Sequence, residues 1–175
     1  MNNKEFWNKH YKKHKLTRPS NWAKICLPRI KGSAVELGCG GGRDLYFFRL
    51  NGIDMHGVDG SNEDLFIIRQ DVEDYIKENK SPTNVYTRFF WHAIPRETQL
   101  AILKWTKKRI FIEARTILDK PKNLYGKHKR YLVNPSKLTL DLVEHGFKII
   151  QASTGRGLSP YRDEDPHLVR IIAEK

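Results

Sequence analysis

The sequence predicts an α/β fold in which helices cover both faces of a doubly wound, mostly parallel sheet. Three observations support this prediction. Strand-like and helix-like segments alternate along the chain without an internal repeat. A short apolar strand leads into clustered glycines and a helix in the run Val35-Glu36-Leu37-Gly38-Cys39-Gly40-Gly41-Gly42-Arg43-Asp44. A second strand ends in a carboxylate in the run Ile53-Asp54-Met55-His56-Gly57-Val58-Asp59-Gly60.

Each element follows from apolar periodicity and from the residues that begin or end helices. Pro95 opens a helix at a position where its missing N–H is harmless, and Asn134-Pro135-Ser136 begins another helix that runs to Gly146. In chain order, we expect a helix at 4–14, a strand at 33–37, a helix at 42–51, a strand at 53–58, a helix after Asp71, a strand at 84–90, the helix at Pro95, a strand at 109–114, the helix to Gly146, and strands at 147–152 and 167–173.

Length and composition indicate one domain over residues 1–175, with an N-terminal helical lid at 1–30 and an α/β core at 31–175. The sequence has no apolar run of membrane-spanning length, and Met1-Asn2-Asn3-Lys4-Glu5 lacks the hydrophobic stretch of a secretory signal, so we expect a cytoplasmic protein. Cys26 and Cys39 lack the spacing of metal ligands, and no metal site is expected.

The net charge of +12 favours an anionic partner. Part of this charge is concentrated at Lys104, Lys107, Lys108, Arg109, Arg115, Lys120, Lys122, Lys127, Lys129 and Arg130, against Glu113 and Asp119. Nucleic acid is one such partner, but the sequence contains no base-reading or RNA-binding module. A set of solvated lysines without any partner is the alternative.

The glycine-rich turn predicts a nucleotide-cofactor site, because glycine lets the backbone bend sharply and lets a ligand lie against it. The pattern Gly-x-Gly-Gly-Gly differs from the Gly-x-Gly-x-x-Gly of dinucleotide enzymes. Glu36, two residues before the first glycine, would repel a diphosphate and attract an ammonium or sulfonium group. A plain strand-to-helix connection is the structural alternative.

The glycine turn, the later Gly57-Val58-Asp59-Gly60-Ser61 and the run Arg69-Gln70-Asp71-Val72-Glu73-Asp74 together resemble the class I S-adenosylmethionine-dependent methyltransferases, whose fold is Rossmann-like. The resemblance implies S-adenosylmethionine as cofactor, with Glu36 near its amino acid moiety, Gly38 and Gly40 against the ligand, and Asp59 on the ribose. It further implies cofactor contacts from Arg43, Asp44, Gly60, Ser61, Asp71 and Val72.

Segments elsewhere resemble a small bacterial subgroup linked to surface-glycan and phospho-sugar modification. They are Phe6-Trp7-Asn8-Lys9-His10-Tyr11, Arg18-Pro19-Ser20-Asn21-Trp22-Ala23, 86–94, 112–116, 126–131 and 163–166. Phe6, Trp7, Tyr11 and Trp22 are expected either to form a lid over the cofactor or to dock the first helix on the core.

One region departs from the family pattern, because only twelve positions separate Asp59 from Asp71, where the family has a full helix and a third strand. Phe66-Ile67-Ile68 is strand-like and leaves room for about one helical turn. We therefore expect a short or irregular sheet edge, no helix longer than about two turns in 61–70, and Asp71 at the adenine edge.

Methyl transfer from a sulfonium requires mainly that the acceptor is aligned and that water is excluded. His92, just beyond the fourth strand, is the candidate general base, with a packed histidine as the alternative. Arg88 is a candidate acceptor clamp or a buried ion-pair partner. Arg115, His128 and Arg130 suit recognition of a phosphoryl or carboxylate group, with a solvated basic loop as the alternative.

Glu113, at the end of the fifth strand, is expected to orient Arg115 or to assist proton removal. The sequence as a whole predicts a methyltransferase that acts on an anionic small molecule or glycan precursor. An RNA or protein methyltransferase is the alternative enzyme, and a non-catalytic cofactor-binding partner subunit is the alternative from another class.

Overall fold

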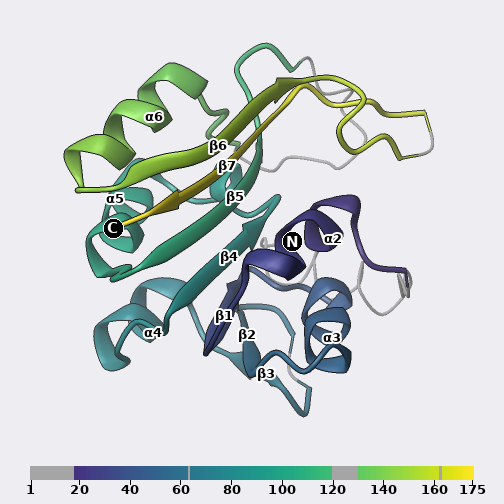
Figure 1. Ribbon diagram of the computed structural model, residues 1–175, viewed down its shortest axis with the longest axis vertical. Helices are drawn as coiled ribbons and strands as arrows, with labels where there is room; N and C mark the ends of the chain where they lie inside the picture. Colours follow the sequence, from purple (N-terminus) through teal and green to yellow (C-terminus); the bar gives the residue numbers. More distant parts are fainter. Residues whose placement is uncertain (1–17, 63, 120–129, 162) are drawn as a thin grey trace.

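A seven-stranded sheet runs through the molecule in the order β3-β2-β1-β4-β5-β7-β6 (Figure 1). The computed structural model describes residues 18–62, 64–119, 130–161 and 163–175. β1 to β5 are parallel, and β7 is antiparallel to both β5 and β6. The strands are β1 Ala34–Leu37, β2 Met55–Asp59, β3 Ile67–Arg69, β4 Asn84–Arg88, β5 Arg109–Arg115, β6 Lys148–Gly155 and β7 Leu168–Glu174.

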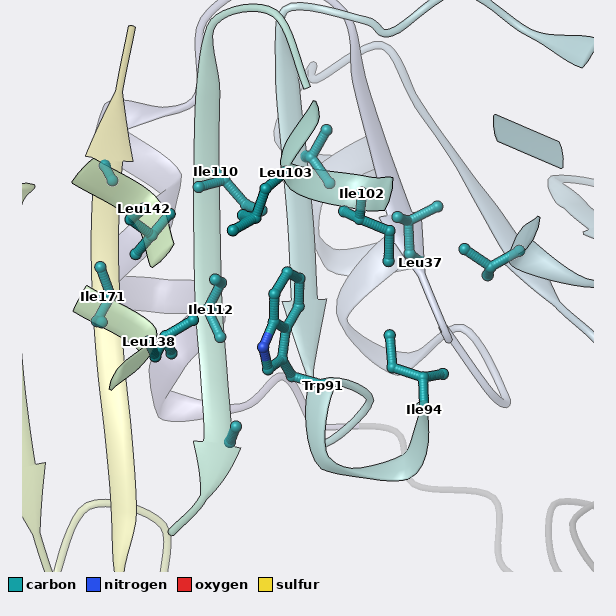
Figure 2. Close-up of a cluster of buried hydrophobic side chains, with 14 of the residues drawn as sticks. Leu37, Trp91, Ile94, Ile102, Leu103, Ile110, Ile112, Leu138, Leu142 and Ile171 are labelled. Atoms are coloured by element: carbon teal, nitrogen blue, oxygen red, sulfur yellow. The ribbon is translucent and has the colours of Figure 1, made fainter. Parts of the chain in front are cut away.

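Helices cover both faces of this sheet, as the sequence predicts (Figure 1). The helices are α2 Asn21–Cys26, α3 Arg43–Leu50, α4 Val72–Glu78, α5 Arg96–Trp105 and α6 Pro135–Glu144, with 3-10 turns η1 Leu27–Arg29 and η2 Trp91–Ala93. α2 and α3 bury Trp22, Leu45 and Phe48 against one face. α4, α5 and α6 bury their apolar side chains, among them Leu103 and Leu142, against the other face (Figure 2).

The parallel strands bring their carboxyl ends to one edge of the sheet. In the register of the ladders, Leu37 pairs with Thr87, Asp59 with Arg69, and Arg88 with Glu113. We call this the carboxyl edge, and the opposite side of the sheet the amino edge. Ligands of open α/β sheets bind outside the carboxyl ends of the strands, so this edge is where a site is expected.

The crossover from β2 to β3 contains no helix in its described residues. Parallel strands normally need a crossover of about a dozen residues. Here Phe66 provides the packing that a helix would supply, because its ring lies 3.6 Å from the Arg49 guanidinium and 6.3 Å from the ring of Tyr46 on α3. The predicted short edge is confirmed, and β3 has three residues.

The other expected elements agree with the structure within a few residues, except at two places. The strand expected over 84–90 ends at Arg88, because Phe89 has a positive φ of 55° that turns the chain out of the sheet. The helix expected at 4–14, and with it most of the expected lid, lies outside the described residues. No described helix is long and apolar enough to cross a membrane.

Candidate functional site

The glycine-rich turn follows β1 at the carboxyl edge. Gly38, Gly40 and Gly42 all have positive φ values, which explains the glycines there. The N–H groups of Gly38 and Cys39 donate to the carbonyl of Val58, and the N–H of Gly42 donates to the carbonyl of Cys39. The turn thus uses much of its own donor capacity, unlike a nest that cradles phosphate.

Glu36 lies on β1 beneath this turn, with 4% of its surface exposed. A backbone hydrogen bond from Leu45 reaches its carboxylate, but Oε2 is buried without a hydrogen-bond partner. Burial raises the pKa of Glu36 well above 4.5, and the nearby charge of Asp44 raises it further. An orphaned carboxylate oxygen beside the cofactor turn fits a cationic ligand group.

Asp59 ends β2 beside the glycine turn. Its Oδ2 accepts the N–H of Gly40 at 2.8 Å, and its Oδ1 accepts the N–H of Ser61 at 2.9 Å and the hydroxyl of Ser61 at 2.5 Å. A carboxylate has about four acceptor positions, so these three bonds leave capacity for a ligand hydroxyl. The Asp59 side chain is held in place before any ligand arrives.

A cleft of about 290 Å³ opens beside Asp59. Its lining joins the end of β2 to the start of α4, the turn after β4 and the start of α5, with Asp59, Gly60, Asp71, Val72, Glu73, Asp74, Phe90, Ile94 and Thr98. Asp71 is the N-cap of α4. Asp71 and Val72 therefore share one cleft with Asp59 and Gly60, as expected for an adenosine moiety that extends from its ribose to its base.

Phe89 and Phe90 send their rings in different directions from the end of β4. An ideal Cβ built on Gly38 would lie 2.1 Å from Cδ2 of Phe90, so this ring covers Gly38 and also lines the cleft. The Phe89 ring instead lies 4.3 Å from the Arg88 guanidinium and 5.8 Å from that of Arg115. Among the described non-glycine residues, only Phe89 has a positive φ. Such strain concentrates at functional sites.

Asp44 has a structural role that corrects the prediction of a cofactor contact. Its carboxylate accepts the N–H of Ser20 at 2.8 Å, the Ser20 hydroxyl at 2.6 Å and the Tyr86 hydroxyl at 2.9 Å, all of them buried bonds. Nε of Arg43 lies 3.4 Å from the same carboxylate. Asp44 therefore ties the segment before α2 to β4, and it shapes the cofactor site through its effect on Glu36.

Trp22 is 1% exposed and packs in the core between α2, α3 and the sheet. The guanidinium of Arg170 lies 5.3 Å from its ring. For Trp22, the structure therefore supports docking of a helix on the core rather than a lid over the cofactor. Phe6, Trp7 and Tyr11 lie outside the described residues.

Glu113 is fully buried between two arginines. Its Oε2 accepts from Nε of Arg170 at 2.6 Å, and its Oε1 lies 2.9 Å from Nε of Arg88, although that N–H does not point at the oxygen. Arg88 also donates to the hydroxyl of Ser159 at 3.0 Å. The expectation that Glu113 orients Arg115 is wrong. Glu113 orients Arg88, and one carboxylate is shared by two guanidinium groups.

Arg115 is buried and already paired, which corrects its expected role as an acceptor clamp. NH1 donates to Asp119 at 2.9 Å, and NH2 donates to Glu164 at 2.7 Å. Glu164 belongs to the loop between β6 and β7, so Arg115 fastens this loop to the end of β5. Two carboxylates neutralise its fork, and an anionic acceptor would have to displace one of them.

His92 lies on η2, which the buried Trp91 ring anchors in the core (Figure 2). Its Nδ1 accepts the backbone N–H of Arg115 at 3.1 Å, so the proton of the neutral ring is assigned to Nε2. Burial and the charges of Arg115 and Arg130 lower the pKa of His92 to about 3. This geometry argues against His92 as the general base and supports the packed-histidine alternative.

Arg130 is close enough for its charge to act on His92, so the structure brings these two predicted residues together. His128 lies outside the described residues. Sequence reasoning missed Phe90, Arg170, Ser159 and Glu164. Phe90 had a signal, because it follows a strand at the carboxyl edge. The others come from a distant hairpin whose position no local pattern reveals.

Comparisons with known proteins were made on this basis. No protein-family model and no curated protein matches the chain. Solved structures do match, across nearly the whole chain. A SAM-dependent methyltransferase from Archaeoglobus fulgidus is 19% identical, with a TM-score of 0.64 over 98% of this chain and 94% of that one.

TehB from Haemophilus influenzae is 14% identical, with a TM-score of 0.71 over 97% of this chain and 67% of that one. The 1,6-didemethyltoxoflavin-N1-methyltransferase from Burkholderia thailandensis is 16% identical, with a TM-score of 0.65 over 88% of this chain and 76% of that one. With the strand order 3-2-1-4-5-7-6 and an antiparallel β7, these matches show that the chain has the class I methyltransferase fold.

Proposed function

We propose that this protein transfers a methyl group from S-adenosylmethionine to a small-molecule acceptor that carries an anionic group. The orphaned Oε2 of Glu36 carries this proposal. A buried carboxylate oxygen without a partner at a cofactor turn is costly unless a ligand supplies a donor, and the cofactor has an α-ammonium and a sulfonium.

The residues present fit the cofactor along its length. Glu36 would hold the ammonium end, Asp59 would accept from a ribose hydroxyl, and Asp71 with the backbone of Val72 would hold the adenine edge in the cleft. Four carboxylates, Asp59, Asp71, Glu73 and Asp74, line that cleft. They disfavour cofactors that carry phosphates, which agrees with the sequence argument against a dinucleotide.

When bound, the sulfonium supplies an activated methyl group, so the chain has to align the acceptor and exclude water. The acceptor side of the site is electropositive, because the charges of Arg115 and Arg130 both lower the pKa of His92. Arg88 has 16% of its side chain exposed, and it shares the carboxylate of Glu113 with Arg170. Arg88 and Arg130 are our candidates for holding an anionic acceptor.

An acceptor that arrives as an anion does not require proton removal. This agrees with a His92 whose Nδ1 already accepts a hydrogen bond and whose pKa is about 3. Phe89, with its ring beside Arg88 and Arg115, would position the acceptor. His128 and the N-terminal lid stay predictions, as does a cytoplasmic location.

Within the anionic class, a phosphorylated sugar or glycan precursor is our leading acceptor, on the sequence resemblance. A small-molecule acceptor is supported by the Burkholderia thailandensis structure, which holds 1,6-didemethyltoxoflavin together with S-adenosylhomocysteine. An RNA or protein methyltransferase is the alternative enzyme. A cofactor-binding subunit without its own activity is the alternative from another class.

Calorimetry with S-adenosylmethionine, S-adenosylhomocysteine and NAD tests the cofactor. Preference for NAD would overturn the proposal. Methylation assays with phosphorylated sugars beside a mixed RNA pool test the acceptor. Methylation of RNA with steep salt dependence, but not of phospho-sugars, would favour the RNA alternative. Tight cofactor binding without turnover on any acceptor, restored by a second protein, would favour the subunit alternative.

In the same assay, Arg88→Ala tests the acceptor clamp. We expect a higher KM for the acceptor and nearly unchanged affinity for S-adenosylhomocysteine, because the two ligands would occupy separate parts of the site. Arg130→Ala should behave in the same way. A variant that weakens cofactor binding as strongly as acceptor binding would contradict this assignment.

A further inference from the structure

The amino edge of the sheet, opposite the candidate site, carries a row of exposed cations that the proposed function does not use. We propose that this row binds the sugar-phosphate backbone of a nucleic acid. We call it the basic edge, and its members are Arg29, Lys31, Lys80, Lys107, Lys108 and Lys148, all exposed. They come from the segments entering β1, β4 and β5 and from the first residue of β6.

Hydrogen bonds make these segments one continuous surface. The side chain of Asn84 donates to the carbonyl of Lys31 at 2.9 Å, and the N–H of Lys107 donates to the Ser81 hydroxyl at 3.2 Å. NH1 of Arg109 donates to the carbonyl of Arg29 at 2.6 Å. The cations are therefore held side by side, although they lie far apart in the sequence.

The C-terminal residue joins the same surface. The N–H of Lys175 donates to the carbonyl of Lys108 at 2.8 Å, and its Nζ donates to the last carbonyls of α5. In Figure 1 the C-terminus lies on the same side as the amino ends of β4 and β5. Lys175 thus fixes the strand ends that carry Lys107 and Lys108.

Few negative charges offset these cations. Among the described residues at these strand ends, the carboxylates are Asp54, just before β2, and Glu174, at the end of β7. Glu174 is already paired with Arg109 at 2.6 Å. The charge concentration at 104–130 in the sequence is therefore divided by the fold. Lys107 and Lys108 lie on the basic edge, whereas Arg115 and Arg130 lie at the carboxyl edge.

The geometry of the row suits a chain of phosphates. Neighbouring strands lie about 4.8 Å apart, so the five strands from β1 to β6 span about 19 Å. That length would face several consecutive phosphates of one strand. A bound nucleic acid would lie roughly 20 Å from the carboxyl edge, given the seven residues of β5. The proposal therefore concerns docking and not the methyl acceptor.

A nucleic acid fits better than an anionic membrane. Proteins that bind membrane surfaces combine basic residues with apolar side chains that insert among the lipids. The described segments 27–33, 79–83 and 106–108 expose no large hydrophobic side chain. They also contain no exposed aromatic ring for base stacking, so binding should be independent of sequence and dominated by phosphate contacts.

Fluorescence anisotropy with a labelled poly(U) RNA of about 20 nucleotides tests the proposal, between about 50 and 200 mM salt. The variant is Lys107→Ala/Lys108→Ala. The matched control is Arg18→Ala/Lys137→Ala, which removes the same charge from two exposed side chains toward the carboxyl edge. Circular dichroism and S-adenosylhomocysteine binding confirm that both variants stay folded.

We expect the Lys107/Lys108 variant to lose at least fivefold in RNA affinity and its log–log salt slope to fall by about 1.4, or about 0.7 per phosphate contact on a single strand. The control should change less than twofold. Equal losses in both variants would show a general charge effect and would overturn the proposal. It would also be overturned if the unaltered protein bound phosphatidylserine vesicles but not RNA. Neither result affects the proposed methyl transfer.

Discussion

Replacing Glu36 with Gln should make the free protein more stable and at the same time weaken its binding of the cofactor. Glutamine is nearly isosteric, and its carbonyl can keep the hydrogen bond from Leu45. The substitution removes a buried charge whose Oε2 has no partner and which is repelled by Asp44. It also removes the group that we propose for the cofactor's ammonium.

The sign of the stability change depends on pH. The pKa of Glu36 is raised in the folded state, so the unfolded chain releases this proton at lower pH than the folded chain does. The stability contribution of Glu36 is therefore fully present below about pH 4.5 and is lost as the pH rises toward the folded pKa. Glu36→Gln should match the unaltered protein most closely near pH 4 and exceed it at pH 7.5.

An unsatisfied buried polar group costs about 1–3 kcal/mol, and a charged group costs more. Because the glutamine amide also lacks a partner, we expect a net gain of about 1–2 kcal/mol at pH 7.5. For a chain of this length, that raises the Tm by about 2–8 °C. Loss of a charged contact to the ligand should weaken S-adenosylmethionine binding by about 1.5–3 kcal/mol, or roughly 10- to 150-fold.

Differential scanning fluorimetry at pH 4 and pH 7.5, with and without S-adenosylhomocysteine, measures both effects. Glu113→Gln is the matched control, because this buried carboxylate already has two arginine partners and its loss should destabilise by about 3–5 kcal/mol. If Glu36→Gln were destabilising at both pH values and bound the cofactor normally, the role assigned to the orphaned oxygen would be refuted.

Three further predictions follow from the same geometry. His92→Asn should retain the acceptor for the Arg115 N–H and leave the pH–rate profile without change near neutrality, whereas a lost limb at pH 6–7 would restore His92 as a base. Because the pKa of His92 is lowered to about 3, the unaltered protein should lose stability between about pH 6.5 and 3 at up to about 1.4 kcal/mol per pH unit, and His92→Asn should flatten this loss in urea titrations; equal slopes would contradict it. Gly38→Ala should cost at least about 1–2 kcal/mol, since φ is 71° and the new Cβ would collide with Phe90, and Phe90→Ala should recover the part due to the collision.

Local sequence patterns were sufficient for the cofactor half of the site. Glycines with positive φ, a carboxylate at the end of β2 and another at the start of α4 are read from neighbouring residues, and parallel strands necessarily bring their carboxyl ends together. The twelve positions between Asp59 and Asp71 were likewise enough to predict a crossover without a long helix.

The acceptor half depended on contacts that the sequence does not reveal. Arg115, Glu113 and His92 were chosen for their chemistry and their place at strand ends, but their roles depend on their partners. Glu164 and Arg170 lie 49 and 57 residues from the groups that they bind.

The sequence by itself determined the fold class and the cofactor turn, because backbone conformation and apolar periodicity are local properties. Only the tertiary structure decided which of the buried charges were already neutralised. Pairing removes Arg115 as a free clamp, burial depresses the pKa of His92, and the lack of a partner leaves Glu36 available for a ligand. An ionisable side chain takes its chemistry from the charges and the solvent around it, and folding sets both.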